Sequence, residues 1–327
     1  TKDIRNIALV GHSGSGKTTL AEALLVKSGM KGEAGTIERG STTMDHDPLE
    51  RKFQHSLDSS IASLDHKGMH LNLIDTAGIP DFRGPTLAAM TAVETTAVVV
   101  NAHSGIELAT RRLMRRAKQR RLCRMIIINR IDVEGVDLTQ VVSDLREEFG
   151  PECLPINLPA ENLTTVRDCF FHTEGETDIF SLSEAHDAII DQVVEVNDEL
   201  MEKYLEGEEL TREELHAAFE QALREGHLVP ICFTSAHTGA GVGELLDFMH
   251  QLAPSPREGN PPPFVKGEGE EAVEVSISTK SSDHVLAHVF KITNDPFVGK
   301  LSVFRIYQGT VRPDSQLLIG DARKPFK

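Results

Sequence analysis

The sequence contains only four cysteines, and no two of them form a C-x-x-C pair. A disulfide framework or a zinc site is therefore not expected, and the thiols are expected to be reduced. No apolar run approaches the roughly 20 residues that a membrane-spanning helix needs. The chain begins with a strand pattern and a glycine-rich loop rather than with the basic and apolar regions of a signal peptide. These absences predict a cytoplasmic protein with no membrane partner.

Positive charge is also scarce. The 34 Lys and Arg residues are outnumbered by 50 Asp and Glu residues, which gives a formal net charge of −16. A chain this acidic is not expected to bind free nucleic acid through bulk electrostatics.

Apolar runs alternate with helical patterns up to about residue 149, and the alternation resumes near residue 228. Strands are expected at 4–10, 57–65, 69–74, 96–102, 124–129 and 229–234, and helices at 17–28, 84–94, 106–121 and 138–149. The strands are continuous apolar runs, which is typical of a mostly parallel sheet with helices on both faces. Residues 30–55 lack periodicity and are expected to form a long polar loop, a feature that is often functional.

The alternation is interrupted and later resumes, and this divides the chain into parts. Residues 1–149 and 228–253 are expected to form one α/β domain. Residues 150–227 are acidic, with helical patterns at 184–204 and 211–225, and are expected to be an α-rich subdomain inserted into it. Prolines mark a stiff linker at 254–263. The strand patterns within 264–327 are too few for a complete small barrel, so a partial β-barrel domain is expected there.

The strongest motif is GHSGSGKT at residues 11–18, which matches the phosphate-binding pattern G-x-x-x-x-G-K-[ST]. It follows an apolar strand and opens a helix, so that backbone N–H groups and the helix N-terminus can surround phosphates. Lys17 is expected to reach the β- and γ-phosphates, and the Thr18 hydroxyl to bind Mg²⁺. The phosphate-binding residues are expected to be Gly11, His12, Ser13, Gly14, Ser15, Gly16, Lys17, Thr18 and Thr19.

A second motif, D-T-A-G, begins at Asp75, where an apolar strand ends. The Asp75 carboxylate is expected to hold Mg²⁺ through water, and the Gly78 N–H to meet the γ-phosphate.

A third segment, Asn129-Arg130-Ile131-Asp132, also follows a strand. The Asp132 carboxylate can accept hydrogen bonds from guanine N1–H and N2–H₂, which adenine does not offer, and the planar guanidinium of Arg130 can cover the ring. Ser235 and Ala236 are expected to complete the base pocket with a backbone N–H. Together these motifs predict GTP or GDP with Mg²⁺ and disfavour an ATPase.

The order GHSGSGKT, DTAG, NRID and TSA resembles that of translational GTPases. LMEKYLEGEEL at 200–210 and NDPFVGKLSVFRIYQGTV at 294–311 resemble the inserted subdomain and the second domain of elongation factor G. The resemblance covers nearly the whole chain. It implies a P-loop G domain, GTP hydrolysis, a role in ribosomal translocation, and the ribosome as partner. The basic run at 111–124 is then either the solvated face of a helix or a ribosomal contact.

The sequence departs from the elongation factor G pattern at three positions. Gly14 replaces an aspartate. Ser56 stands where a Mg²⁺-binding threonine belongs, and it either binds the ion through its hydroxyl or simply begins a strand. Ile79 replaces a histidine that orients the attacking water.

The catalytic positions implied by the resemblance are Lys17, Gly78 and Ile79, and at the last of these the expected histidine is missing. Because isoleucine cannot form a hydrogen bond, slow intrinsic hydrolysis is expected; alternatively, Ile79 packs as a hydrophobic gate and backbone groups hold the water. A translocase paralogue, a ribosome-protection or release-type GTPase, and a non-hydrolysing GTP sensor all remain compatible with the sequence.

Overall fold

The computed structural model describes residues 3–208, 210–267, 269, 272–278, 280–295, 297–318 and 325. The chain divides into two units, residues 1–260 and residues 261–327. Of the last nine residues of the expected second domain, 319–327, only residue 325 is among the described residues.

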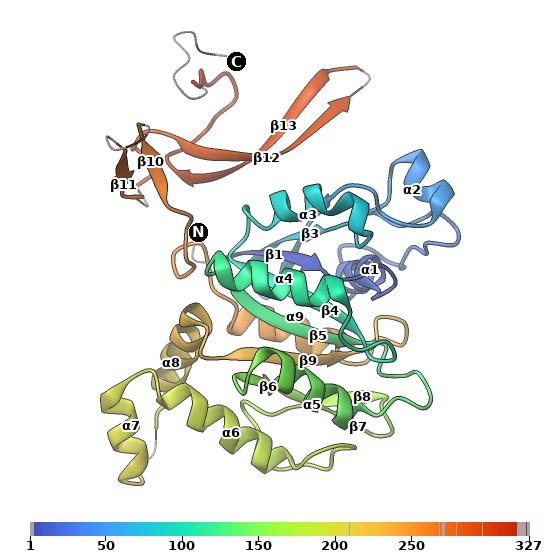
Figure 1. Cartoon of the computed structure of the whole chain (residues 1–327), viewed down its shortest axis with the longest axis vertical. Coiled ribbons are helices and arrows are strands. Elements are labelled where there is room, and N and C mark those ends of the chain that lie inside the picture. Colours follow the sequence, from blue (N-terminus) through green and yellow to red (C-terminus); the bar gives the residue numbers. More distant parts are fainter. Residues whose placement is uncertain are drawn as a thin grey trace. The chain divides into compact units, whose positions relative to one another are not determined.

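A seven-stranded sheet forms the centre of the first unit (Figure 1). Its strands, in spatial order, are β2 (Ser60–His66), β3 (Met69–Asp75), β1 (Ile4–Val10), β4 (Thr95–Asn101), β5 (Cys123–Asn129), β9 (Val229–Thr234) and β6 (Cys153–Pro155). Only β2 is antiparallel to its neighbour, and all other pairs are parallel. The expected mostly parallel α/β sheet is confirmed.

Helices cover both faces of this sheet. α1 (Lys17–Lys27) and α9 (Val242–Gln251) pack together on one face, while α4 (Leu108–Gln119) and α5 (Leu138–Phe149) lie on the other (Figure 1). The central strands are consequently buried; β5 is buried at every residue. Among the described residues, no helix is both long enough and apolar enough to cross a bilayer.

The polar loop expected at 30–55 contains a short helix, α2 (Pro48–Phe53). Asp47 caps it by accepting a hydrogen bond from the Leu49 N–H at 2.7 Å, and the Glu50 carboxylate accepts one from the Asp47 N–H at 3.3 Å. This reciprocal cap, with Pro48 at the first helical position, stabilises a helix too short to show periodicity.

Helix α3 (Arg83–Ala89), which follows the 3₁₀ turn η1 (Pro80–Phe82), ends five residues before the predicted end at 94. Glu94 directly precedes the central strand β4 instead. Its carbonyl accepts a hydrogen bond from the Cys123 N–H at 3.1 Å, and its carboxylate accepts one from Asn6 Nδ2 at 2.7 Å. These tertiary hydrogen bonds override the helical pattern.

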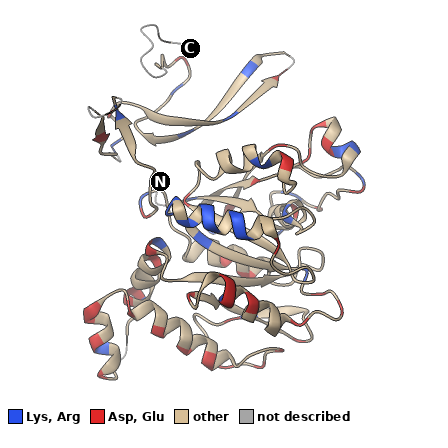
Figure 2. Ribbon diagram, viewed as in Figure 1, with Lys and Arg blue, Asp and Glu red and all other residues tan. Residues whose placement is uncertain are grey.

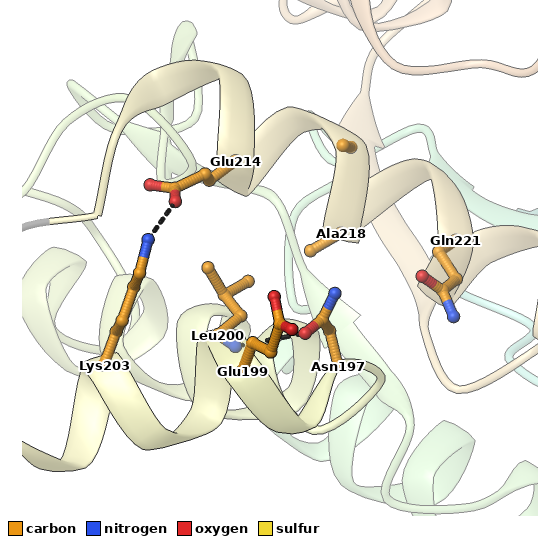
Figure 3. Close-up of a pocket in the computed structure, with 8 residues that line it drawn as sticks. Asn197, Glu199, Leu200, Lys203, Glu214, Ala218 and Gln221 are labelled. Atoms are coloured by element: carbon orange, nitrogen blue, oxygen red, sulfur yellow. Dashed lines mark hydrogen bonds and ion pairs between the residues drawn. The ribbon is translucent and has the colours of Figure 1, made fainter.

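The expected insertion at 150–227 begins with β6, which pairs with β9 and so extends the main sheet. Its other elements are β7 (Asn157–Ala160), β8 (Thr165–Asp168), α6 (Leu182–Val194), α7 (Asp198–Leu205) and α8 (Arg212–Glu225). The single helix predicted at 184–204 is two helices, because Asn197 caps α7 by accepting from the Leu200 N–H at 3.1 Å. Lys203 donates to Glu214 at 2.6 Å across a small pocket between α7 and α8 (Figure 3).

The second unit consists of antiparallel strand pairs. β10 (Phe264–Lys266) pairs with β11 (Val273–Val275), and β12 (Leu286–Asp295) pairs with β13 (Gly299–Gln308). These strands agree with the β-structure that the sequence predicts after the linker.

Candidate nucleotide site

The predicted site residues follow parallel strands that end at one edge of the sheet. Gly11 follows β1, Asp75 ends β3, Asn129 ends β5, and Ser235 follows β9. Ligands of open α/β sheets bind outside the carboxyl ends of the strands. The fold therefore gathers motifs that are far apart in sequence into one place.

The glycine-rich loop packs directly against the end of β5. Gly16 has a left-handed φ of 87°, and a Cβ there would lie 2.4 Å from Asn129 Nδ2. The same Asn129 amide donates to the Ser15 carbonyl at 3.0 Å. Only glycine fits at residue 16, and this close packing ties the phosphate loop to the segment that follows β5.

Lys17 is buried at the start of α1, and its ammonium lies over the loop. Nζ donates to the carbonyls of Gly11 at 3.1 Å and His12 at 2.8 Å. Burial lowers the pKa of Lys17 to about 8, although the charges of Asp75 and Glu107 oppose this shift. A buried ammonium that donates to the neutral carbonyls of Gly11 and His12 is well suited to bind an anion.

The D-T-A-G segment lies against the same loop. The Ser13 N–H donates to the Gly78 carbonyl at 3.1 Å. A Cβ on Gly78 would lie 2.5 Å from Lys17 Nζ and 2.6 Å from the Ser13 nitrogen. A side chain at residue 78 would therefore displace the lysine or the loop.

Four oxygen-bearing side chains form a chain of contacts beside Lys17. Thr18 Oγ1 donates to Asp75 Oδ2 at 2.6 Å and lies 3.4 Å from Ser56 Oγ, which donates to Asp45 Oδ1 at 2.7 Å. The structure thus brings Ser56 to Thr18 and Asp75, as the metal assignment required. It also adds Asp45, which the sequence analysis missed because a single aspartate in an aperiodic loop carries no pattern.

The charge of this cluster fits a divalent cation. Burial raises the pKa of Asp75 to about 7; the Lys17 charge and the Thr18 hydrogen bond lower it, while Asp45 raises it. Asp75 Oδ1 is buried without a hydrogen-bond partner among the described residues. Two carboxylates and two hydroxyls supply hard oxygen ligands of the kind that Mg²⁺ prefers. The described part of the chain holds no group of three or more His, Cys, Asp or Glu side chains that could bind a metal, so the hydroxyls would be needed.

At the base end, Asp132 Oδ1 is buried and has no hydrogen-bond partner within the described residues. Such orphaned acceptors are rare in folded proteins, and a ligand with N–H groups would satisfy this one. Arg130, next to it in the chain, is exposed and has a left-handed φ of 66°.

The backbone N–H groups of the segment after β9 donate hydrogen bonds within the protein. The Ser235 N–H donates to the Ala240 carbonyl at 2.8 Å, and the Ala236 N–H donates to Asn129 Oδ1 at 3.0 Å. Both backbone donors therefore have protein partners in this structure. The Ala236 bond holds Asn129 in place, and the role of Ser235 and Ala236 in binding the base stays a prediction.

Ile79 and His12 both line a cavity at the edge of the nucleotide site. Ile79 is half-buried, and both residues line a space that α4 closes on its far side. His12 Nε2 lies 3.2 Å from Glu107 Oε1. Glu107 is the second residue that the sequence analysis missed, since nothing local connects it to the loop.

Comparison with known proteins places this geometry in a family. Residues 2–255 match the family described as "Elongation factor Tu GTP binding domain". The chain belongs to this family of translational GTPases.

The relatives of this translational GTPase include proteins named "Elongation factor G-like protein". This chain is 32% identical to such a protein from Mycobacterium tuberculosis, over 95% of this chain and 45% of the relative. It is also 32% identical to such a protein from Thermotoga maritima, over 95% of this chain and 46% of the relative. A crystal structure of a protein from Thermus thermophilus matches this chain over its whole length, with a TM-score of 0.81 and 31% sequence identity. The match covers 51% of the Thermus protein. The resemblance to elongation factor G is confirmed, and the chain spans about half the length of these relatives.

Proposed function

We propose that this chain is the GTP-binding part of a ribosome-directed factor of the elongation factor G type, which acts in translocation in the cytoplasm. Membership of a translational GTPase family supports this proposal. The observation that carries it is the placement of complementary groups at one sheet edge. Lys17 offers a buried cation at one end, and Asp132 offers a buried, unpaired acceptor at the other.

At the phosphate end, the residues of the glycine-rich loop would surround the nucleotide. Lys17 would exchange the Gly11 and His12 carbonyls, which it contacts here, for β- and γ-phosphate oxygens. Thr18 and Ser56 would bind Mg²⁺ directly and Asp75 through water, with Asp45 orienting Ser56. When bound, Mg²⁺ supplies positive charge that offsets the charge developing on the phosphates.

At the base end, Asp132 would accept from the N1–H and N2–H₂ of guanine. Adenine has no donors at these positions and would leave the buried oxygen unsatisfied, which disfavours it strongly. Asn129, held by Ala236, would position this pocket against the loop, and Arg130 would cover the ring.

Hydrolysis requires a water to attack the γ-phosphorus. A new P–O bond forms as the bond to the β–γ bridging oxygen breaks, which gives GDP and inorganic phosphate. Ile79 cannot orient this water, so we expect a low intrinsic rate that rises when the ribosome positions the water. The γ-phosphate would order loop 30–56 and segment 78–84, and its loss would release them.

Phosphate release tests the proposal. Purified protein with GTP and Mg²⁺ is expected to release phosphate slowly alone and faster with ribosomes; no release above that of ribosomes alone would contradict it. Ile79→His is expected to raise the rate by about 10²-fold or more, because a positioning or proton-transfer group is restored. Ile79→Leu is the matched control and should leave the rate unchanged.

The same assay separates the alternatives. A non-hydrolysing GTP sensor would bind GTP and ribosomes without turnover, and Ile79 favours that alternative. If Ile79→His releases phosphate no faster than Ile79→Leu, the result would favour the other interpretation. In that interpretation Ile79 is a hydrophobic gate and backbone groups hold the water.

A further inference from the structure

A cavity of about 500 Å³ lies between the 77–80 segment, α3 and α4. Its volume is within the range of small-molecule sites. Much of its lining is apolar and comes from Ala77, Ile79, Leu87, Ala109 and Leu113. This apolar lining favours a ligand with an apolar portion that fits inside the cavity.

Four arginines, however, also line this cavity: Arg83, Arg112, Arg115 and Arg116. None of the four forms an ion pair with another described residue. Arg111, on the same helix but outside the cavity, is paired with Glu148 at 3.0 Å. Arg116 Nε is buried and has no hydrogen-bond partner in the described part of the chain.

The concentration of positive charge is local. The chain carries a net charge of −16, yet α4 presents a row of Lys and Arg (Figure 2). The partly buried guanidinium of Arg116 is only partly solvated, which strengthens its attraction to an anion, and the exposed Arg112 and Arg115 add positive charge beside it. Guanidinium also matches the planar carboxylate and the phosphate oxygens through paired hydrogen bonds.

We propose that this cavity binds a small amphipathic anion, whose apolar body occupies the cavity and whose carboxylate or phosphate head pairs with Arg112, Arg115 and Arg116. The cavity adjoins the nucleotide site and shares Gly11, His12 and Gly78 with it, while the arginines of the proposed anion site lie on α4. The binding does not depend on GTP hydrolysis, so it stands or falls independently of the proposed function.

Calorimetric titration of the whole chain tests the proposal, with GDP and Mg²⁺ present to fill the phosphate loop. Decyl phosphate and decanoate, below their micelle concentrations, are expected to bind. Decyltrimethylammonium has the same tail with a cationic head, and inorganic phosphate has the head without the tail. Each of these two is expected to bind at least about tenfold more weakly. Binding of the cation as tight as that of the anions, or equal binding of inorganic phosphate and decyl phosphate, would overturn the proposal.

Two variants locate the site. Replacing Arg112 and Arg115 together by Gln is expected to weaken decyl phosphate binding by about tenfold or more, through lost charged hydrogen bonds. Both side chains are exposed, so folding should be unaffected. Arg111→Gln, which removes a charge from the same helix outside the cavity, is the matched control. Ala109→Phe should also weaken binding by narrowing the cavity. An Arg112/Arg115 variant that binds like Arg111→Gln would place the ligand elsewhere and refute the assignment.

Discussion

Asp75 and Asp132 each carry a buried carboxylate oxygen for which the described residues provide no hydrogen-bond donor. Leaving such an atom unsatisfied costs about 1–3 kcal/mol, and more when the group is charged. Both oxygens lie at the same sheet edge, at positions where the motifs require a ligand. At the scale of single residues, the site therefore gives up stability that a bound nucleotide and metal would restore.

Asp132→Asn tests the base assignment. The Asn amide offers an N–H₂ group toward the guanine N–H donors, so GDP affinity should fall by about 10²-fold or more, while xanthine, which has a carbonyl at C2, should bind better than before. Calorimetry with GDP, XDP and ADP measures this shift. Glu134→Gln, an exposed residue nearby, should change none of the three affinities. Wild-type protein that holds ADP as firmly as GDP would contradict the assignment.

At the scale of elements, α1 anchors the loop that follows it. The fully buried Glu22 carboxylate accepts hydrogen bonds from Lys31 Nζ at 2.6 Å and the Gly35 N–H at 2.8 Å, and also from the Thr43 N–H. Burial alone would raise the pKa of Glu22, but these hydrogen bonds lower it below its ordinary value. One side chain thus holds residues 31–43 against the helix that begins with Lys17.

Glu22→Gln should loosen this loop. The amide places an N–H₂ group against backbone donors, so we expect a loss of about 1–3 kcal/mol of unfolding free energy at pH 7. Because the pKa is lowered in the folded state, wild-type Glu22 stabilises fully above its ordinary pKa. This stabilisation disappears as the pH falls through the lowered value. Urea unfolding at several pH values measures both effects.

The exposed Glu33 in the same loop provides the control for that experiment. Glu33→Gln should change stability by less than about 0.5 kcal/mol. Equal effects of the two substitutions would show that the anchor makes no difference.

At the scale of the whole molecule, the candidate site lies entirely within the unit formed by residues 1–260. It connects residues from α1, loop 30–56 and the ends of β3, β5 and β9. A ligand that binds all of these at once stabilises the folded unit in proportion to its occupancy.

GDP with Mg²⁺, at about 100 times its dissociation constant, should therefore raise the unfolding free energy of this unit by about 2.7 kcal/mol. EDTA in excess of Mg²⁺ should remove part of this gain, because Thr18, Ser56 and Asp75 lose their shared ion. Thermal unfolding followed by circular dichroism measures both. A gain that EDTA leaves unchanged would contradict the metal assignment.

The sequence alone determined the class of fold and the motifs, because both depend on local order. Apolar runs and glycine spacing are readable along the chain, and strands that end at Asp75 and Asn129 must meet at one edge of a parallel sheet. Element ends were less predictable: α2 depends on a cap formed by Asp47, and α3 ends at Ala89, five residues before Glu94, whose carbonyl bonds to β5.

Only the tertiary structure decided which single residues join the site. Asp45 reaches Ser56, and Glu107 reaches His12, through folding of segments with no recognisable pattern. The cavity that Ile79 lines likewise depends on the tertiary structure, because its walls come from α3, α4 and the 77–80 segment. Side chains that meet across long sequence separations leave no local signal, since their contact is created by the packing of whole elements.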